Sequence, residues 1–180
     1  TAIFVDCDLN ASQLNVLKQW IDTGTLEYLY LISTISPING PTFIASLNNN
    51  YGAQMLRKIN ISRLSRLEIS SLISYLPRIR YLSLQYCDFE LHEFFYLIKN
   101  TPTPCQVETV ILSGNRNTRR IQPKLQFPPY LREINVSDIF WESESFKNFF
   151  QSVLLHQPIK NPQEFDDFET IRKSSRIRKL

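Results

Sequence analysis

Glycine is scarce in this chain, with only four residues among 180. A phosphate-binding loop needs several glycines close together, because backbone N–H groups must approach the phosphate oxygens. The four glycines are widely separated, so we expect no glycine-rich phosphate loop. They are Gly24, Gly40, Gly52 and Gly114.

Cysteine is also rare, and its three residues form an odd number at unrelated spacings. Such a pattern predicts no disulfide framework and favours a reducing, cytoplasmic setting. No run of about 18 apolar residues occurs, so we expect no transmembrane helix. Because the first residue is Thr1, we expect the chain to be part of a longer protein. The cysteines are Cys7, Cys87 and Cys105.

A strong excess of positive charge is missing as well. The chain has 20 basic and 17 acidic residues, a formal net charge of +3. The last 20 residues contain five basic and four acidic residues, and the other 160 contain 15 and 13. A nucleic-acid-binding domain needs a basic patch that matches the phosphate backbone. We therefore expect no nucleic-acid partner.

Groups that could form an active site are few and isolated. Neither His92 nor His156 has a second histidine or cysteine at metal-ligand spacing. A catalytic cysteine needs a base and a lowered thiol pKa, and no base can be assigned to Cys87 or Cys105. We predict a protein without enzymatic activity, cofactor or metal. Trp20 and Trp141 are expected to be packing residues.

What the sequence does contain is a recurring phrase, leucine-x-x-leucine-x-leucine, with isoleucine or valine as replacements. Complete copies follow one another at intervals of 30, 23, 28 and 24 residues, and a truncated copy, Ile3-Phe-Val5, fits at the start. One such unit cannot bury its apolar face, but stacked units can, each strand pairing with the next. The complete copies begin at Leu26, Leu56, Ile79, Val107 and Leu131.

The segments between the copies return the chain to the start of the next strand. Apolar residues at helical spacing predict helices over 11–23, 66–76, 91–99 and 143–156. Gly24 is expected to cap the first of them. Three prolines predict an extended path over 119–130, and the unit after Leu26 is irregular, with Pro37, Gly40 and Pro41. In the last helix the predicted apolar stripe is Phe146, Phe149, Phe150, Val153 and Leu154.

The chain resembles leucine-rich-repeat proteins of the ribonuclease-inhibitor-like class, and within it the irregular repeats of CARMIL-type actin regulators and related protist proteins. The resemblance rests on the irregular intervals, the helical returns and phrases such as Val-Ile-Leu-Ser-Gly-Asn115. It implies an α/β solenoid of about six repeats over residues 1–158, with parallel strands on the concave face. Residues 159–180 would be a cap helix, the start of a further unit or a linker.

Leucine-rich repeats often place an Asn or Cys in the turn after each strand, where it bonds the exposed backbone of neighbouring turns. Cys87 and Asn115 suit this position. The remaining units are predicted to depart from the pattern to different degrees. Their residues at this position are Asp8, Thr34, Leu64 and Ile139.

The side chains between the core leucines are expected to face the concave side, because successive strand residues alternate. Three tyrosines and a lysine occupy such positions in three consecutive repeats. Tyrosine offers a large contact area at low entropic cost. We therefore predict a protein-binding surface on this face, formed by Tyr28, Tyr30, Lys58, Tyr81 and Ile111.

The resulting function is a protein–protein interaction module within a larger intracellular protein, such as a CARMIL-like scaffold of the actin cytoskeleton. Two alternatives are the substrate-recognition repeats of an F-box-type ubiquitin ligase adaptor and the targeting arm of an enzyme or effector. The tail from Phe165 to Leu180 has an apolar side and a basic end. We expect it to cap the solenoid or begin a further unit, in preference to contacting a membrane.

Overall fold

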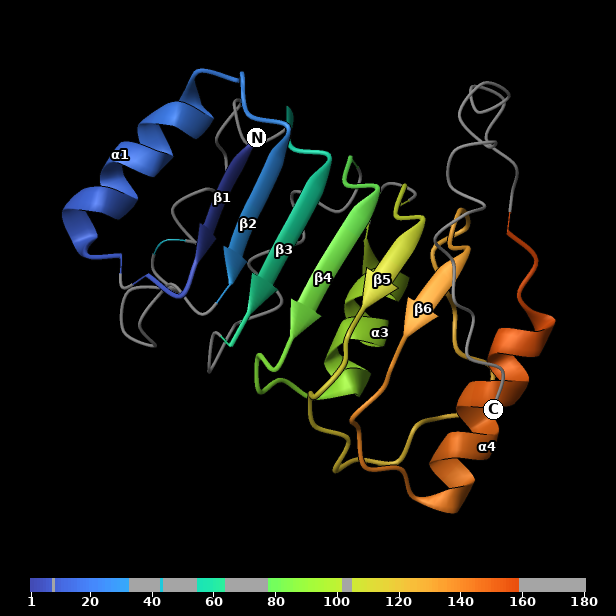
Figure 1. The fold of residues 1–180 in the computed structure, drawn as a ribbon. Helices are drawn as coiled ribbons and strands as arrows, with labels where there is room; N and C mark the ends of the chain where they lie inside the picture. Colours follow the sequence, from blue (N-terminus) through green and yellow to red (C-terminus); the bar gives the residue numbers. More distant parts are fainter. Residues whose placement is uncertain (8, 33–42, 44–54, 64–77, 102–104, 159–180) are drawn as a thin grey trace, which may run out of the picture.

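The chain folds around a single sheet of six parallel strands, with helices in the connections (Figure 1). The computed structural model describes residues 1–7, 9–32, 43, 55–63, 78–101 and 105–158. The predicted α/β class is therefore confirmed. In chain order the elements are β1 (Ala2–Val5), α1 (Ala11–Asp22), β2 (Tyr28–Ile32), β3 (Lys58–Ser62), β4 (Tyr81–Gln85), α3 (Leu91–Asn100), β5 (Thr109–Ile111), β6 (Glu133–Asn135) and α4 (Ser143–Leu155).

The strands lie side by side in chain order, from β1 to β6. In Figure 1, α3 lies behind β4 and β5, α1 lies beside β1, and α4 lies beyond β6. The side of the sheet turned toward the viewer carries no described helix, and we call it the open face. The five predicted phrases coincide with β2 to β6, and their second leucines align across the sheet. This row is Leu29, Ile59, Leu82, Val110 and Ile134.

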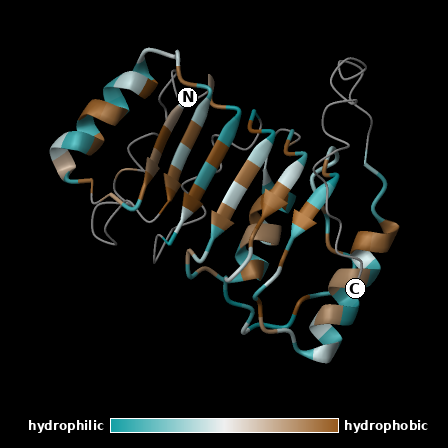
Figure 2. Cartoon of the chain, in the orientation of Figure 1, coloured by the Kyte–Doolittle hydropathy of each residue, from teal (hydrophilic) through white to brown (hydrophobic). Residues whose placement is uncertain are grey.

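The core lies on the helix side of the sheet. Leu29, Leu82, Leu84 and Val110 have no exposed surface at all. Most of the intervening strand residues are polar or aromatic, and they face the open side, so the colours of Figure 2 alternate along several strands. This alternation has the period of two that a half-buried strand requires.

The same backbone connection recurs at successive junctions of the sheet. At the entry to each strand from β3 to β6, one carbonyl of the preceding unit accepts two N–H groups. The carbonyl of Glu27, for example, accepts from Arg57 at 2.8 Å and from Lys58 at 3.1 Å. The chain thus repeats one local geometry although the intervals between strands differ. The accepting residues are Glu27, Arg57, Arg80 and Glu108.

A second recurring feature is a residue of positive φ just after the strands, which the sequence reasoning missed. The N–H of such a residue donates to the following unit, as Tyr86 does to the Ser113 carbonyl at 2.9 Å. Only glycine, and to a lesser degree aspartate and asparagine, adopts this conformation at low cost. Aspartate or glycine soon after a strand was therefore the available signal. These residues, with φ between 50° and 69°, are Asp6, Arg63, Tyr86, Gly114 and Asp138.

The helices α1 and α3 agree with the prediction. A capping box closes the start of α1: the Gln13 N–H donates to Asn10 Oδ1 at 3.1 Å, and the Asn10 N–H donates to Gln13 Oε1 at 2.9 Å. Gly24 follows its end with φ of 69°, as expected of a helix-terminating glycine. The proline-containing stretch 119–130 is not helical, also as predicted.

As a truncated copy of the phrase, Ile3-Phe-Val5 would place Ile3 and Val5 in the core, and this placement is wrong by one residue. Ala2 pairs with Leu29 and Phe4 with Leu31, so Ala2 and Phe4 face the core. Ile3 and Val5 are 61% and 50% exposed. A shift of one residue moves every side chain to the other side of a strand. The pairing register with β2 determines which β1 side chains face the core. The truncated copy of the phrase is too short to predict it.

The predicted apolar stripe of α4 is confirmed for Phe149 and Val153, which pack in or against the core, and wrong for the other three residues. Phe149 is buried, but Phe146, Phe150 and Leu154 are 38%, 50% and 67% exposed. The helix instead buries Phe149 with three polar residues, because the non-helical stretch beneath it leaves backbone groups that need partners. The Ile121 N–H donates to Ser145 Oγ at 3.1 Å, Asn148 Nδ2 donates to the Ile121 carbonyl at 2.9 Å, and the Leu125 N–H donates to Ser152 Oγ at 3.0 Å.

This orientation of α4 predicts different sensitivities for two nearby positions. Replacing Asn148 with alanine leaves the buried Ile121 carbonyl without its donor, and should lower the free energy of unfolding by about 1–3 kcal/mol. Replacing the half-exposed Phe150 with glutamine should change it by less than about 1 kcal/mol. Urea denaturation followed by circular dichroism measures both. A larger loss at Phe150 than at Asn148 would contradict the described orientation of α4.

Several predicted features lie outside the described residues. They are the helix over 66–76, the irregular stretch around Pro37, Gly40 and Pro41, the tail over 159–180, and the turn positions Asp8, Thr34 and Leu64.

Candidate functional site

The sheet register brings most of the predicted surface residues together on the open face. Tyr28 pairs with Lys58, and Lys58 pairs with Tyr81, so the three side chains form one row across β2, β3 and β4. Tyr30 lies in the next row, paired with Asn60. Neighbouring strands are about 4.8 Å apart, so adjacent side chains in these rows are within reach of one another.

Ile111 lies on the same face but apart from the tyrosines. Its row runs from Tyr30 through Asn60 and Ser83 to Ile111. Three strand spacings separate Ile111 from Tyr30, which is about 14 Å. The structure therefore gathers four of the five predicted residues into one group, which we call the tyrosine–lysine patch: Tyr28, Tyr30, Lys58 and Tyr81.

Lys58 is exposed, and its ammonium lies 5.0 Å from the centroid of the Tyr28 ring. This is a cation–π distance. Of the three tyrosines predicted to share this surface with Lys58, Tyr28 is the one described in contact with the ammonium. The pKa of Tyr81 is raised, first by burial and then by the nearby Tyr30 and Glu133 side chains. A hydrogen bond with Ser83 acts in the opposite direction. Its phenol therefore stays protonated at neutral pH.

Apolar side chains extend the patch beyond the predicted residues. Ile3 pairs with Tyr30, and Val5 pairs with Ile32. All four point to the open face, and the two β1 residues are at least half exposed. Exposed apolar surface next to tyrosines is typical of interaction sites. Sequence reasoning missed Ile3 and Val5 because it had assigned them to the core.

Asn60 lies at the centre of the group, between Tyr30 and Ser83. Within the described part of the chain, its Oδ1 is shielded from solvent and accepts no hydrogen bond. A shielded carbonyl without a donor costs free energy, about 1–3 kcal/mol. The open face thus holds a shielded acceptor for which no donor is described.

The turns after β4 and β5 hold the two predicted turn residues, and both are structural. Asn115 is buried; its Nδ2 donates to the carbonyls of Leu84 and Leu112 at 2.6 and 2.8 Å, and its Oδ1 accepts from the Cys87 N–H at 2.9 Å. The Cys87 thiol is fully buried and donates to the Ile61 carbonyl at 3.5 Å. These bonds join three consecutive units of the sheet.

Beside them, Tyr86 crosses over the backbone of Gly114. Its hydroxyl donates to Asp138 Oδ2 at 2.7 Å. A Cβ at Gly114 would lie 2.1 Å from the Tyr86 ring, which no real contact allows. Gly114 therefore meets two demands at once, a φ of 69° and the close approach of an aromatic ring.

The remaining candidate groups from the sequence also have structural contacts. Burial raises the pKa of the Cys105 thiol to about 11, so it stays protonated at neutral pH. His156 forms a hydrogen bond to the Leu131 carbonyl at 3.0 Å. Trp141 packs on Phe149 with ring centroids 4.9 Å apart, as predicted, whereas Trp20 is half-exposed.

Glu90, beside His92, holds the turn that follows β5. Its two carboxylate oxygens accept from the Thr118 hydroxyl at 2.7 Å and the Thr118 N–H at 2.9 Å. Partial burial raises the pKa of Glu90, but these hydrogen bonds and the charge of Arg116 outweigh it and lower the pKa overall. His92 Nδ1 lies 4.0 Å from the same carboxylate. The hydrogen bonds between Glu90 and Thr118 join the start of α3 to the neighbouring unit.

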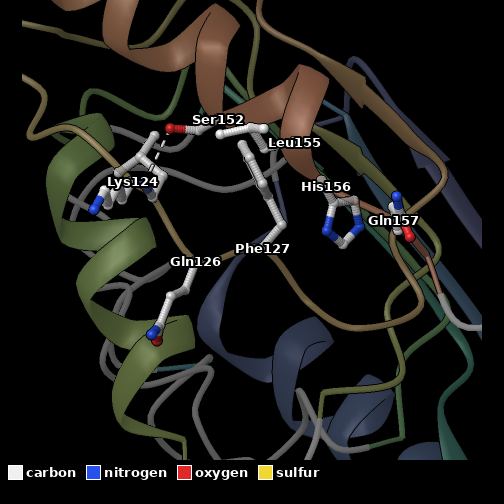
Figure 3. Close-up of a pocket in the computed structure, with 8 residues that line it drawn as sticks. Lys124, Gln126, Phe127, Ser152, Leu155, His156 and Gln157 are labelled. Carbon is white, nitrogen blue, oxygen red and sulfur yellow. Dashed lines mark hydrogen bonds between the residues drawn. The ribbon is translucent and has the colours of Figure 1, made fainter.

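Two surface hollows lie away from the tyrosine–lysine patch. One, of about 400 Å³, lies between the end of α4 and the preceding extended stretch, and Figure 3 shows its lining, with Phe127 beside His156. The other, of about 590 Å³, is lined by residues of 115–119 with Asp138, Phe140 and Glu142. Neither is lined by a residue of the patch.

Comparison with protein-family models, curated proteins and solved structures gives no match. The function is therefore inferred from this chain's own geometry. Among the described residues, no group of three or more His, Cys, Asp or Glu side chains is placed to hold a metal ion. No described helix is both long and apolar enough to cross a membrane.

Proposed function

We propose that this chain is a leucine-rich-repeat solenoid that acts as a non-enzymatic protein-interaction module of a larger intracellular protein. The solenoid part of the proposal is supported by the repeated carbonyl junctions and by the row of positive-φ residues. A strand, a left-handed turn and a return segment recur in one order, which is how stacked repeats share a continuous core. In this proposal the open face is the concave face.

The interaction part of the proposal is carried by one observation: the open face exposes a contiguous group of aromatic and apolar side chains at its β1–β4 end. Tyr28, Lys58 and Tyr81 form one row, and Ile3 and Tyr30 lie in the next. Monomeric soluble proteins rarely expose large contiguous apolar patches, and those that they expose often mark interaction sites. The CARMIL-like scaffold remains our proposal for the protein family, on the sequence phrases that carry that resemblance.

Pull-down with the purified chain tests the interaction surface. Tyr30→Ala and Tyr81→Ala should each weaken partner capture about tenfold or more, because a buried tyrosine at an interface contributes about 1–2 kcal/mol or more. Tyr96→Ala is a matched control, since Tyr96 is 69% exposed on α3, away from the open face. Circular dichroism and thermal denaturation of each variant establish that it is folded.

The surface assignment is wrong if both open-face variants retain every partner. The same conclusion follows if a substitution on the helix side, such as Lys99→Glu, abolishes capture while the open-face variants do not.

A further inference from the structure

We infer that the partner segment bound by the open face is an extended peptide in which an acidic residue lies three or four positions from an apolar one. This inference rests on the proposed interaction function and adds the chemistry of the partner. The acidic side chain would contact Lys58, and the apolar side chain would cover Ile3 and Tyr30.

The charge of the surface around β3 carries the first half of the inference. Residues 55–63 contain three basic side chains and no acidic one. Lys58 and Arg63, at opposite ends of β3, are both exposed. Among the described residues, no carboxylate forms an ion pair with Lys58, whose contact is the Tyr28 ring. An exposed cation–π contact stabilises an ammonium only weakly. A carboxylate from a partner would add a stronger, charge-assisted hydrogen bond.

The strand neighbours of Lys58 on the open face are uncharged side chains. The row that contains it continues through Tyr81 and Thr109, and reaches Glu133 only on β6. The Glu133 carboxylate accepts a hydrogen bond from the Thr109 hydroxyl at 3.4 Å, and Glu133 is not among the described ion-pair partners of a basic side chain. Lys58 is therefore left with a ring contact and no described ion pair.

The apolar side chains on β1 and β2 carry the second half. Ile3 and Val5 are 61% and 50% exposed, and they continue into Tyr30 and Ile32 by direct strand pairing. This apolar strip begins one strand away from Lys58. A partner that met only the charge would leave the strip in water, and one that met only the strip would leave the ammonium without a counter-charge.

The spacing of the two halves sets the spacing of the partner's residues. Ile3 lies two strands from Lys58 across the sheet and two residues along it. With about 4.8 Å between strands and 3.3 Å per residue, the separation is about 12 Å. An extended peptide covers this distance in three to four residues.

A single-stranded nucleic acid is the main competing ligand, since phosphates suit lysine and bases can stack on tyrosine. The aliphatic side chains of Ile3 and Val5 favour a peptide, because they offer neither stacking nor hydrogen bonds. The basic group is also small, with three residues over 55–63. We therefore assign the surface to a peptide and test the nucleic acid directly.

The test is selection of a displayed library of random 12-residue peptides on the whole 180-residue chain, with selection on Lys58→Glu in parallel. We expect wild type to enrich peptides with Asp or Glu three or four residues from Leu, Ile or Phe, and Lys58→Glu to enrich Lys or Arg in the acidic position. In fluorescence anisotropy the wild-type peptides should bind Lys58→Glu and Ile3→Ser at least tenfold more weakly, and Tyr96→Ala unchanged.

The possible outcomes distinguish an error in the partner chemistry from an error in the proposed interaction surface. If the enriched peptides are neutral or basic and lose affinity with Tyr30→Ala, the open face binds protein but the partner chemistry is wrong. If the enriched peptides bind Tyr30→Ala and Lys58→Glu as well as wild type, or if nothing is enriched, both the inference and the surface assignment fail. A 12-residue oligothymidylate that binds wild type and is lost with Lys58→Glu would overturn the assignment to a peptide.

Discussion

Replacing Asn115 with alanine is expected to lower the free energy of unfolding by about 3–5 kcal/mol, because three buried backbone groups lose their partners at once. Its side chain bonds the carbonyls of Leu84 and Leu112 and the N–H of Cys87. None of these groups can turn to water, since the side chain that joins them is 5% exposed. Urea denaturation followed by far-ultraviolet circular dichroism measures the loss.

Asn10 provides the matched control for this substitution. It also bonds backbone through its side chain, but at the exposed start of α1. Asn10→Ala should cost about 1 kcal/mol, because water can replace the lost cap. Similar losses at Asn10 and Asn115 would show that Asn115 does not bridge the turns as described. Asn115→Asp should be nearly as damaging as alanine, since a carboxylate has no donor for the two carbonyls.

Leu82→Ala is expected to cost about 2–5 kcal/mol, the range for deleting a buried leucine side chain whose surroundings cannot close. Leu82 has no exposed surface and lies between Ile59 and Val110 in the central row of the core. Strands on both sides hold these neighbours in register, so the cavity cannot collapse freely. The midpoint and slope of urea denaturation give the change.

Ile3→Ala should cost less than about 1 kcal/mol, because the Ile3 side chain is already mostly in water. This comparison tests the register of β1, since the truncated repeat phrase alone would place Ile3 in the core and Phe4 outside it. A loss of stability for Ile3→Ala equal to that of Leu82→Ala would show that Ile3 lies in the core and that the described register of β1 is wrong. Phe4→Ala, in turn, should be the more damaging of the two substitutions in β1.

The strands β2 to β6 were predictable because each carries a complete copy of the phrase. Alternation over four or more residues defines which side is buried, and it depends only on the geometry of an extended chain. The helices α1 and α3 were predictable for a similar reason: their apolar residues recur at helical spacing, and Gly24 marks the end of α1. The tyrosine–lysine patch followed directly, because its members are the outward residues of correctly placed strands.

The predictions of buried residues failed in β1 and α4, where the local sequence pattern and the tertiary contacts favour different orientations. At β1 only Ile3 and Val5 suggested the phrase, and pairing of Phe4 with Leu31 overrode them. At α4 the apolar stripe implied burial, but the stretch over 119–130 required hydrogen bonds, and Ser145, Asn148 and Ser152 supply them. Unpaired buried backbone groups cost more than an apolar side chain left half-exposed.

The sequence by itself determined the class of the fold, the order of the strands and which side of β2 to β5 is buried. These follow from periodicity, which is a property of neighbouring residues. Only the tertiary structure decided the register of β1, the orientation of α4, and the position of Tyr86 over Gly114 and toward Asp138. Each of these depends on contacts with a segment that is distant in the sequence, and a one-dimensional pattern does not contain that information.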